Sequence, residues 1–479
     1  MGFMKKTISL ALSTLVVATM FAGCGSKQEA PETAPTDATV PAGYQWATYY
    51  SAEDAAFLPK DIFSEEMFAP GIVTGNAECG WFEVTKQTDV GAYVLKGEYG
   101  KCYELKFPAG TQRAFAIKLK YDPRDKAVGE KVYYWADDTI IDKADLTEET
   151  GRMYTCRKEN EYLLICTNSK DPVYIGERTI IAEADVTGDG WYIPETVGSI
   201  AGGEGSLGYV NWTYQQVLDN LYEPVRQRYP SYITREVIGK DQSGKYDIYG
   251  YVYTPKDYEI TMFLNGGTHA DEQTAFFALA KVMQLIADAQ PEDNLLYTLR
   301  HKVRFVVIPV LNVWGVTESH GRPNSTGQDL NRDFADLTQQ ESKSLISFFE
   351  KYAEDTKIMM DFHIAAGSKV AVYFNFINYS ANAVANYKAT NHMYHRYKEL
   401  GYGTNITDLS KVPGSYIKSD KYLEGRIWNS YGVPTITVEY VTSNGIGFPG
   451  ATTSEAMTAA VETQMNFIIQ NALYFLANP

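Results

Sequence analysis

The sequence predicts an α/β fold for residues 208–479, with a mixed, largely parallel sheet that helices cover on both faces, preceded by an all-β, sandwich-like domain at residues 44–196. Two observations predict this division. Before residue 196, short β-rich runs alternate with turn residues, which is typical of sandwiches. After residue 208, apolar strand-like runs alternate with segments of helical spacing, which is typical of parallel sheets. A Gly-rich stretch at 197–207 predicts a linker between the two regions.

The second region contains the longer elements. Its apolar runs predict buried strands, and its segments with apolar residues three or four apart predict amphipathic helices. The predicted strands are 246–253, 260–264, 303–311, 358–362, 370–376 and 435–440. The predicted helices are 214–227, 273–288, 341–353, 381–400 and 455–476. In such sheets, functional residues gather at the carboxyl ends of the strands.

The start of the chain is predicted to lie outside the fold. A short basic region precedes an apolar run at 8–21, which is short for a membrane span and ends in small residues before Cys24. This order resembles a bacterial lipoprotein signal peptide at 1–23, with cleavage before Cys24 and a lipid on its sulfur; an ordinary secretory signal is the alternative. Residues 24–43 are rich in Pro, Thr and Ala and predict a lipidated tether. We therefore expect an extracytoplasmic protein anchored to a membrane.

The composition limits the classes of partner. With 479 residues, 45% of them hydrophobic and 21% charged, the chain is long enough for two globular domains with sizeable cores. Its formal net charge of −16 argues against nucleic acid as a partner, because a phosphate-binding surface is basic.

The β region carries two groups of residues with more than one interpretation. Its tryptophans either contact polysaccharide or pack within and between the domains; they are Trp46, Trp81, Trp135 and Trp191. Its cysteines either form disulfides, simplest as Cys79–Cys102 and Cys156–Cys166, or remain buried thiols.

Ionisable residues mark the ends of three predicted strands in the second region. His269 and Glu272 follow the strand at 260–264, just beyond a Gly pair. An imidazole and a carboxylate three residues apart at a helix start lie on one side of the chain and can bind a single divalent metal, which then needs a third ligand. His363 ends a second apolar strand, and Glu439 lies near the end of a third. Such residues are costly to bury without a function.

These residues belong to an ordered set of motifs that resembles the zinc carboxypeptidase family, or metallocarboxypeptidases. The resemblance extends from Gly208 to the C-terminus, and it implies a carboxypeptidase-like fold. The matching stretches are HADE at 269–272, PVLNVWG at 309–315, GQDLNRDF at 327–334, DFH at 361–363 and VE at 438–439.

The resemblance implies the following chemistry. One Zn²⁺ per catalytic domain is held by His269, Glu272 and His363, with a fourth position for water. Glu439 is the base that takes the proton of this water, and Arg322 polarises the scissile carbonyl.

The resemblance also implies residues that hold the substrate. Asn331 and Arg332 bind its terminal carboxylate, which a guanidinium meets with two parallel hydrogen bonds. Tyr416 closes over the substrate, although Tyr422 competes for this role. One departure is Asp271, which stands where many relatives carry an arginine. A carboxylate at this position favours a substrate that has an amine nearby.

A second departure concerns the specificity segment. Leu423 or Glu424 falls near the position that sets side-chain preference. If Glu424 lies at the floor of the pocket, a basic side chain or diaminopimelate is favoured.

Three functions remain open from the sequence. The first is an extracytoplasmic zinc carboxypeptidase that cleaves C-terminal residues from peptides or from cell-wall (peptidoglycan) stem peptides. The second is a deacylase on the same site, disfavoured because the pair Asn331–Arg332 is kept. The third is a non-catalytic protein that binds polysaccharide through the β region, disfavoured because no ligand or base is lost.

Overall fold

The computed structural model describes the second region almost completely and the first in part. The described residues are 60–61, 72–73, 81–84, 91–98, 101–133, 139–147, 150–156, 160–168, 173–179, 190–195, 212–366, 372–376, 383–400, 419–442 and 453–478. The predictions for Cys24, Cys79, Tyr416 and the linker 197–207 lie outside them.

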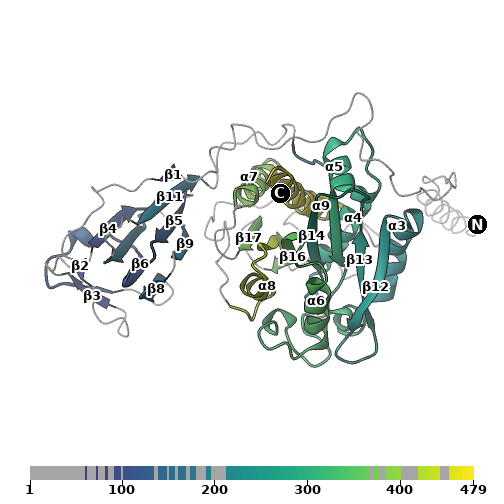
Figure 1. The fold of residues 1–479 in the computed structure, drawn as a ribbon, viewed down its shortest axis with the longest axis horizontal. Helices are drawn as coiled ribbons and strands as arrows, with labels where there is room; N and C mark the ends of the chain where they lie inside the picture. The colour runs from purple at the N-terminus through teal and green to yellow at the C-terminus, as the bar shows by residue number, and fades with distance from the viewer. Residues whose placement is uncertain are drawn as a thin grey trace, which may run out of the picture.

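The first region is all-β, as predicted (Figure 1). Its strands are β1 (Lys60–Asp61), β2 (Ile72–Val73), β3 (Trp81–Val84), β4 (Gly91–Lys96), β5 (Lys101–Phe107), β6 (Arg113–Leu119), β7 (Lys131–Tyr133), β8 (Thr139–Ala144), β9 (Thr150–Thr155), β10 (Tyr162–Thr167) and β11 (Tyr174–Thr179). They form antiparallel sheets in the orders β1-β11-β5-β9, β4-β10-β6-β8 and β2-β3-β7. Side chains of the two four-stranded sheets share one core, which contains Leu105, Phe107 and Leu163.

Cys156 and Cys166 are buried thiols, so the predicted Cys156–Cys166 disulfide is wrong and the alternative interpretation holds for this pair. Cys156 belongs to the core between the two four-stranded sheets, whereas Cys166 belongs to the core on the other face of β10, beneath β3 and β7. Burial raises the pKa of the Cys166 thiol to about 12, so it stays protonated.

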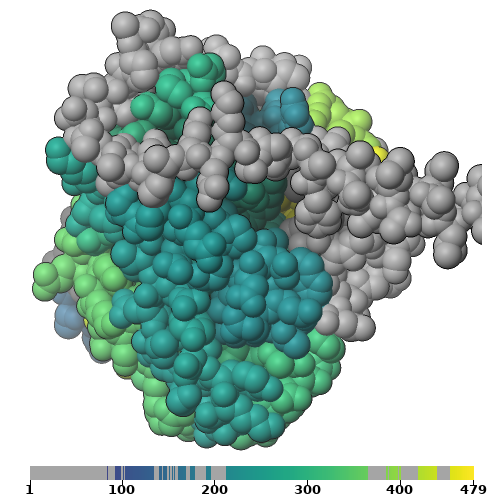
Figure 2. Space-filling view, turned by 90° about the vertical axis from the view of Figure 1, so that its right-hand side faces the viewer, coloured from purple at the N-terminus to yellow at the C-terminus, as the bar shows by residue number. Residues whose placement is uncertain are grey.

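The second region is built on a seven-stranded mixed sheet in the order β12-β13-β15-β14-β16-β18-β17. The strands are β12 (Ile233–Lys240), β13 (Asp247–Tyr253), β14 (Ile260–Gly266), β15 (Val303–Ile308), β16 (Thr356–Ala366), β17 (Val372–Phe376) and β18 (Thr435–Thr442). The four neighbours β15, β14, β16 and β18 are parallel, and antiparallel pairs flank them. The predicted fold class is confirmed, and Figure 2 looks onto one edge of this region.

Helices cover both faces of this sheet (Figure 1). They are α2 (Tyr214–Val217), α3 (Glu223–Arg228), α4 (Gln273–Ala287), α5 (Asn294–Lys302), α6 (Gln340–Glu350), α7 (Ala383–Glu399), α8 (Leu423–Tyr431) and α9 (Thr453–Ala477). Helices α4, α5, α7 and α9 share the larger core with one face, and α6 and α8 share a second core with the other. No helix among the described residues is both long and apolar enough to cross a membrane.

Several predicted boundaries differ from the structure for local reasons. The strand predicted at 303–311 ends at Ile308, because Pro309 has no N–H to donate to a ladder. The helix predicted at 214–227 is interrupted by a π-helical turn at Leu218–Tyr222, which precedes Pro224 in α3. The helices α5 and α8 were not predicted, and β12 was indicated only by the family resemblance, as the first strand of a pair with β13. β12 is an edge strand with mostly exposed or half-buried side chains, so its sequence lacks an apolar run.

Alternation along the strands separates apolar from polar residues near the carboxyl ends. In β16, Ile358, Met360 and Phe362 face the larger core, so Asp361 and His363 point to the side of α8. In β18, Ile436 and Val438 face the larger core in the same way, so Glu439 also points to the side of α8. These three ionisable residues of β16 and β18 therefore lie on one face of the sheet.

Candidate metal centre

The metal-binding candidates come from two adjacent parallel strands. β14 is entirely buried and ends at Gly266, and the chain then turns at Gly267, which has a φ of +63°. A Cβ at Gly267 would lie 2.9 Å from a methyl carbon of Val310, so glycine alone fits this turn. The turn directs His269 back over the sheet and places Glu272 at the N-cap position of α4.

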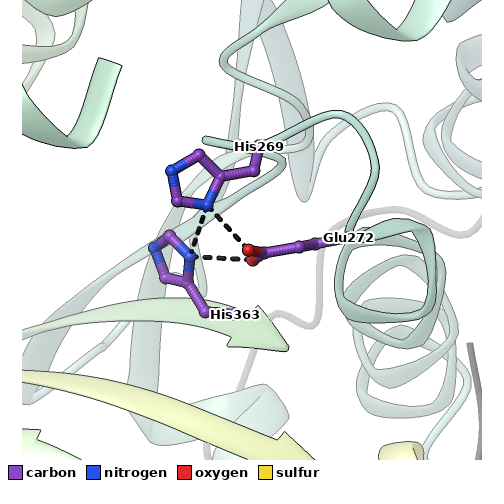
Figure 3. A group of neighbouring side chains, drawn as sticks. All are labelled: His269, Glu272 and His363. Atoms are coloured by element: carbon purple, nitrogen blue, oxygen red, sulfur yellow. Dashed lines mark hydrogen bonds and ion pairs between the residues drawn. The ribbon is translucent and has the colours of Figure 1, made fainter. Parts of the chain in front are cut away.

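Three side chains converge above the sheet (Figure 3). His269 Nδ1 lies 2.8 Å from Glu272 Oε1, and His363 Nδ1 lies 2.8 Å from Glu272 Oε2. The two Nδ1 atoms are 3.2 Å apart. The three residues are buried, and one ligand atom from each lies within 4.8 Å of the others. β16 continues three residues beyond His363, so this histidine lies within the strand and not at its end as predicted, because β18 pairs with β16 as far as Ala366.

Each imidazole turns its outer nitrogen toward a carboxylate. His269 Nε2 lies 3.0 Å from Asp329 Oδ1, and His363 Nε2 lies 2.7 Å from Asp361 Oδ2. Because an ionised carboxylate only accepts hydrogen bonds, each Nε2 carries a hydrogen, and in the neutral rings each Nδ1 holds a lone pair. Two lone pairs and a carboxylate then face one another in a buried space. This donor set fits a divalent cation bound through both Nδ1 atoms and Glu272.

When no metal is bound, protons on the two histidines balance the negative charge of the neighbouring carboxylates. Burial disfavours the charged ring of His363, but Asp361 and Glu272 outweigh it and raise its pKa well above the ordinary value. Burial also opposes the charged ring of His269, whose pKa is raised by Asp329 and Glu272. Burial acts to raise the pKa of Glu272, and the two histidines outweigh it and lower that pKa. A bound cation replaces such protons, so its affinity falls as pH falls.

Asp329 links the metal ligands to Arg322. Its Oδ1 contacts His269 and accepts a hydrogen bond from the backbone N–H of Asn331, and its Oδ2 accepts from Arg322 Nε at 3.0 Å. Arg322 Nη1 also donates to Glu272 Oε1 at 3.2 Å. Burial acts to raise the pKa of Asp329, but His269 and Arg322 outweigh it and lower that pKa. One carboxylate thus fixes a metal ligand, the arginine beside it and the turn that carries Asn331.

The predicted carboxylate-binding pair lies in that turn. Asn331 and Arg332 belong to a short 3-10 helix, Leu330–Arg332. Asn331 Oδ1 accepts a hydrogen bond from the backbone N–H of Leu423, at the start of α8. The exposed guanidinium of Arg332 lies 4.5 Å from the ring centroid of Tyr422. Tyr422 therefore supports this arginine, while Tyr416 lies outside the described residues.

Glu439 and Asp271 complete the surroundings of the centre. Glu439 is half-buried and is paired in register with His363 across β16 and β18. Because neighbouring strands lie about 4.8 Å apart and paired residues point to the same face, Glu439 stands beside the metal ligands. Asp271 is half-buried, and burial together with the charge of Glu272 raises its pKa.

Glu424 also lies close to the centre, since the charges of Asp361, His363 and Glu439 act on it. It lies in the first turn of α8 with no exposed surface, and neither of its carboxyl oxygens has a hydrogen-bond partner among the described residues. Burial and the charges of Asp361 and Glu439 raise its pKa to about 8. A buried carboxyl with no hydrogen-bond partner among the described residues is costly, which makes Glu424 a candidate functional residue.

Asp329 and Asp361 are functional candidates that the sequence patterns did not indicate. A signal was present for Asp361, because residues two apart on a strand share a face and Asp361 stands two before His363. Asp329 is distant from His269 in sequence, and only the folded turn brings the two together.

A buried His–Glu–His cluster at the carboxyl ends of the parallel strands is typical of the metal centre of an α/β metalloenzyme. Residues 218–446 match the sequence model of the zinc carboxypeptidase family, and this segment contains all three ligands. This segment is a zinc carboxypeptidase domain, and its His–Glu–His cluster supports a zinc-dependent metallocarboxypeptidase. No curated protein matches the chain.

Solved structures with a similar chain path include other carboxypeptidases. A metallo-carboxypeptidase from Burkholderia cenocepacia is 12% identical, with 88% of this chain and 100% of that chain covered and a TM-score of 0.44. One from Pseudomonas aeruginosa is 11% identical, covering 88% and 97%, with a TM-score of 0.43. Carboxypeptidase A from Helicoverpa armigera is 14% identical, covering 56% and 74%, with a TM-score of 0.44.

We expect Asp361→Asn to weaken zinc binding by about 10- to 100-fold, because an amide cannot hold the His363 ring as a carboxylate does. Competition with a chromophoric chelator measures the affinity. Asp355→Asn is the control, since the exposed Asp355 pairs with Arg304 at the surface. Equal zinc affinity of Asp361→Asn and the unaltered protein would show that Asp361 does not position the ligand.

Proposed function

We propose that the protein is an extracytoplasmic carboxypeptidase that hydrolyses the C-terminal bond of peptides or of cell-wall stem peptides. The observation that carries this proposal is the register of β16 and β18, which sets Glu439 beside His363 and its two fellow ligands. The bound zinc supplies an activated water and polarises a carbonyl. The remaining steps belong to side chains of this chain.

Glu439 takes the proton of the attacking water and later delivers it to the leaving amine. A carboxylate suits both tasks because it accepts the proton in one step and donates it in the next. Arg322 stands beside Glu272 and Asp329, where its guanidinium meets the negative charge that develops on the carbonyl oxygen. Asn331 and Arg332 hold the terminal carboxylate of the substrate, which sets the bond to be cut.

The buried carboxyl of Glu424 supports a preference for a cationic C-terminal side chain. It lies on the same side of the sheet as Glu439 and His363, whose charges act on its pKa. A nearby ammonium or guanidinium would favour its ionised form and give both oxygens a partner. Lysine, arginine and diaminopimelate carry such a group.

The proposed location rests on the N-terminal sequence. A lipid on Cys24 would hold the mature chain at a membrane surface, with residues 24–43 as the tether. We expect Cys24→Ser to move the protein from the membrane fraction to the soluble fraction of the producing cells. Retention of the variant in the membrane fraction would remove the lipid anchor from the proposal.

Glu439→Gln should retain zinc and lose activity, with kcat/KM at least about 100-fold lower, because the amide cannot accept the proton of water. Hydrolysis of a mixed panel of peptides and muropeptides measures activity, and elemental analysis measures zinc. Glu318→Gln, at an exposed surface glutamate, is the matched control. Undiminished hydrolysis by Glu439→Gln would exclude Glu439 as the base. Release of acyl groups but not of C-terminal residues by the unaltered protein would favour the deacylase alternative.

Glu424→Gln should reduce kcat/KM for substrates ending in lysine or diaminopimelate by at least about tenfold relative to those ending in leucine, because the ionic partner is lost. The ratio of the two kcat/KM values removes any general loss of activity. Glu462→Gln is the control, since Glu462 is also buried, with a pKa that burial raises to about 7, but lies on α9 at the opposite face of the sheet. An unchanged ratio in Glu424→Gln would reject the preference.

A further inference from the structure

A short segment that follows the β region lies against the helices of the second region. Residues 190–195 precede the predicted linker, yet their contacts are with α7 and α9. Asn466 of α9 forms two hydrogen bonds with the backbone of Tyr192. The Tyr192 N–H donates to Asn466 Oδ1, and Asn466 Nδ2 donates to the Tyr192 carbonyl, each at 2.9 Å. Such paired bonds fix both the direction and the register of the segment.

Four further contacts hold the same segment. One turn along α9, Gln470 Nε2 donates to the Gly190 carbonyl at 3.0 Å. The Trp191 ring stacks on the buried His392 ring of α7, with centroids 3.9 Å apart and planes 8° from parallel. Lys388 of α7 places its ammonium 5.9 Å from the centroid of Trp191. The Tyr192 ring packs against the larger hydrophobic core.

The side chains of α9 that bind residues 190–195 are buried in the protein interior. Asn466 has no exposed surface, and Gln470 is only 3% exposed. The second hydrogen of Asn466 Nδ2 is used within α9, on the Glu462 carbonyl, so the amide of Asn466 is fully satisfied only with Tyr192 in place. Buried amides that lose their partners are costly, so α9 is adapted to hold this segment.

We propose that residues 190–195 form a strap that belongs structurally to the catalytic region and holds the β region to α7 and α9. The surface of α7 and α9 then recognises a Gly-Trp-Tyr backbone through Asn466 and Gln470, and its aromatic ring through His392. The β region is thereby retained at one place on the catalytic region, on the side of the sheet opposite Glu424, even when the covalent linker is cut.

The test uses the full-length chain with a specific protease site inserted after Gly203, between the strap and the catalytic region. After cleavage, we expect the two fragments to elute together in gel filtration at micromolar concentration, because the strap stays bound. In a matched protein the site is inserted after Thr187, ahead of the strap, and cleavage should release the β region. Separation of the fragments after the first cut would overturn the proposal, as would their co-elution after the second.

Substitutions test which side chains hold the two fragments together. In the protein cut after Gly203, Trp191→Ala and Asn466→Ala should each weaken fragment association at least about tenfold, since each removes a buried anchor. Trp191→Ala alters only the strap and leaves the catalytic fragment intact, so it remains informative if Asn466→Ala does not fold. A synthetic peptide of residues 188–196 should displace the β fragment, and the same peptide with alanine for Trp191 should not. Equal displacement by both peptides would exclude the stacking on His392.

Discussion

The functional site depends on the meeting of three hydrogen-bond acceptors in a buried space. His269, Glu272 and His363 are held there by groups that stand behind them: Asp329 and Asp361 orient the two rings, and the backbone N–H of Ile364 donates to Glu272 at 3.1 Å. These outer groups leave both Nδ1 atoms directed toward Glu272. Only protons or a bound cation can then balance the two nitrogen lone pairs and the carboxylate. The need to satisfy this cluster explains why a buried sheet carries so many ionisable residues.

The same constraint connects parts of the chain that are distant in sequence. Asp329 contacts a metal ligand, Arg322 and the turn that carries Asn331, and Asn331 in turn binds the start of α8. The helix α8 then brings Glu424 over Asp361 and Glu439. A change in metal ligation would therefore reach Arg322 and the turn that carries Asn331. The metal ligands, Arg322 and Asn331 are parts of one hydrogen-bond network.

Much of this arrangement could be predicted from the sequence. The change from short β-rich runs to alternating strands and helices predicted both regions, because the period of apolar residues follows the element that they cover. His269, Glu272 and His363 were recognisable because polar residues interrupt otherwise apolar strands and match an ordered family motif. The helix α8 was missed, since its nine residues span too few turns to show a clear helical period.

The fold class, the candidate metal ligands and the placement of Glu439 beside them could thus be predicted from the sequence, because these follow from local periodicity and motif order. The folded chain determined the rest through long-range contacts. It placed Cys156 and Cys166 in different cores, set Asp329 behind His269, buried Glu424 with no hydrogen-bond partner in the part of the chain that the structure describes, and laid Trp191 on His392. Each of these depends on which segments distant in sequence share a surface, and no local pattern encodes that.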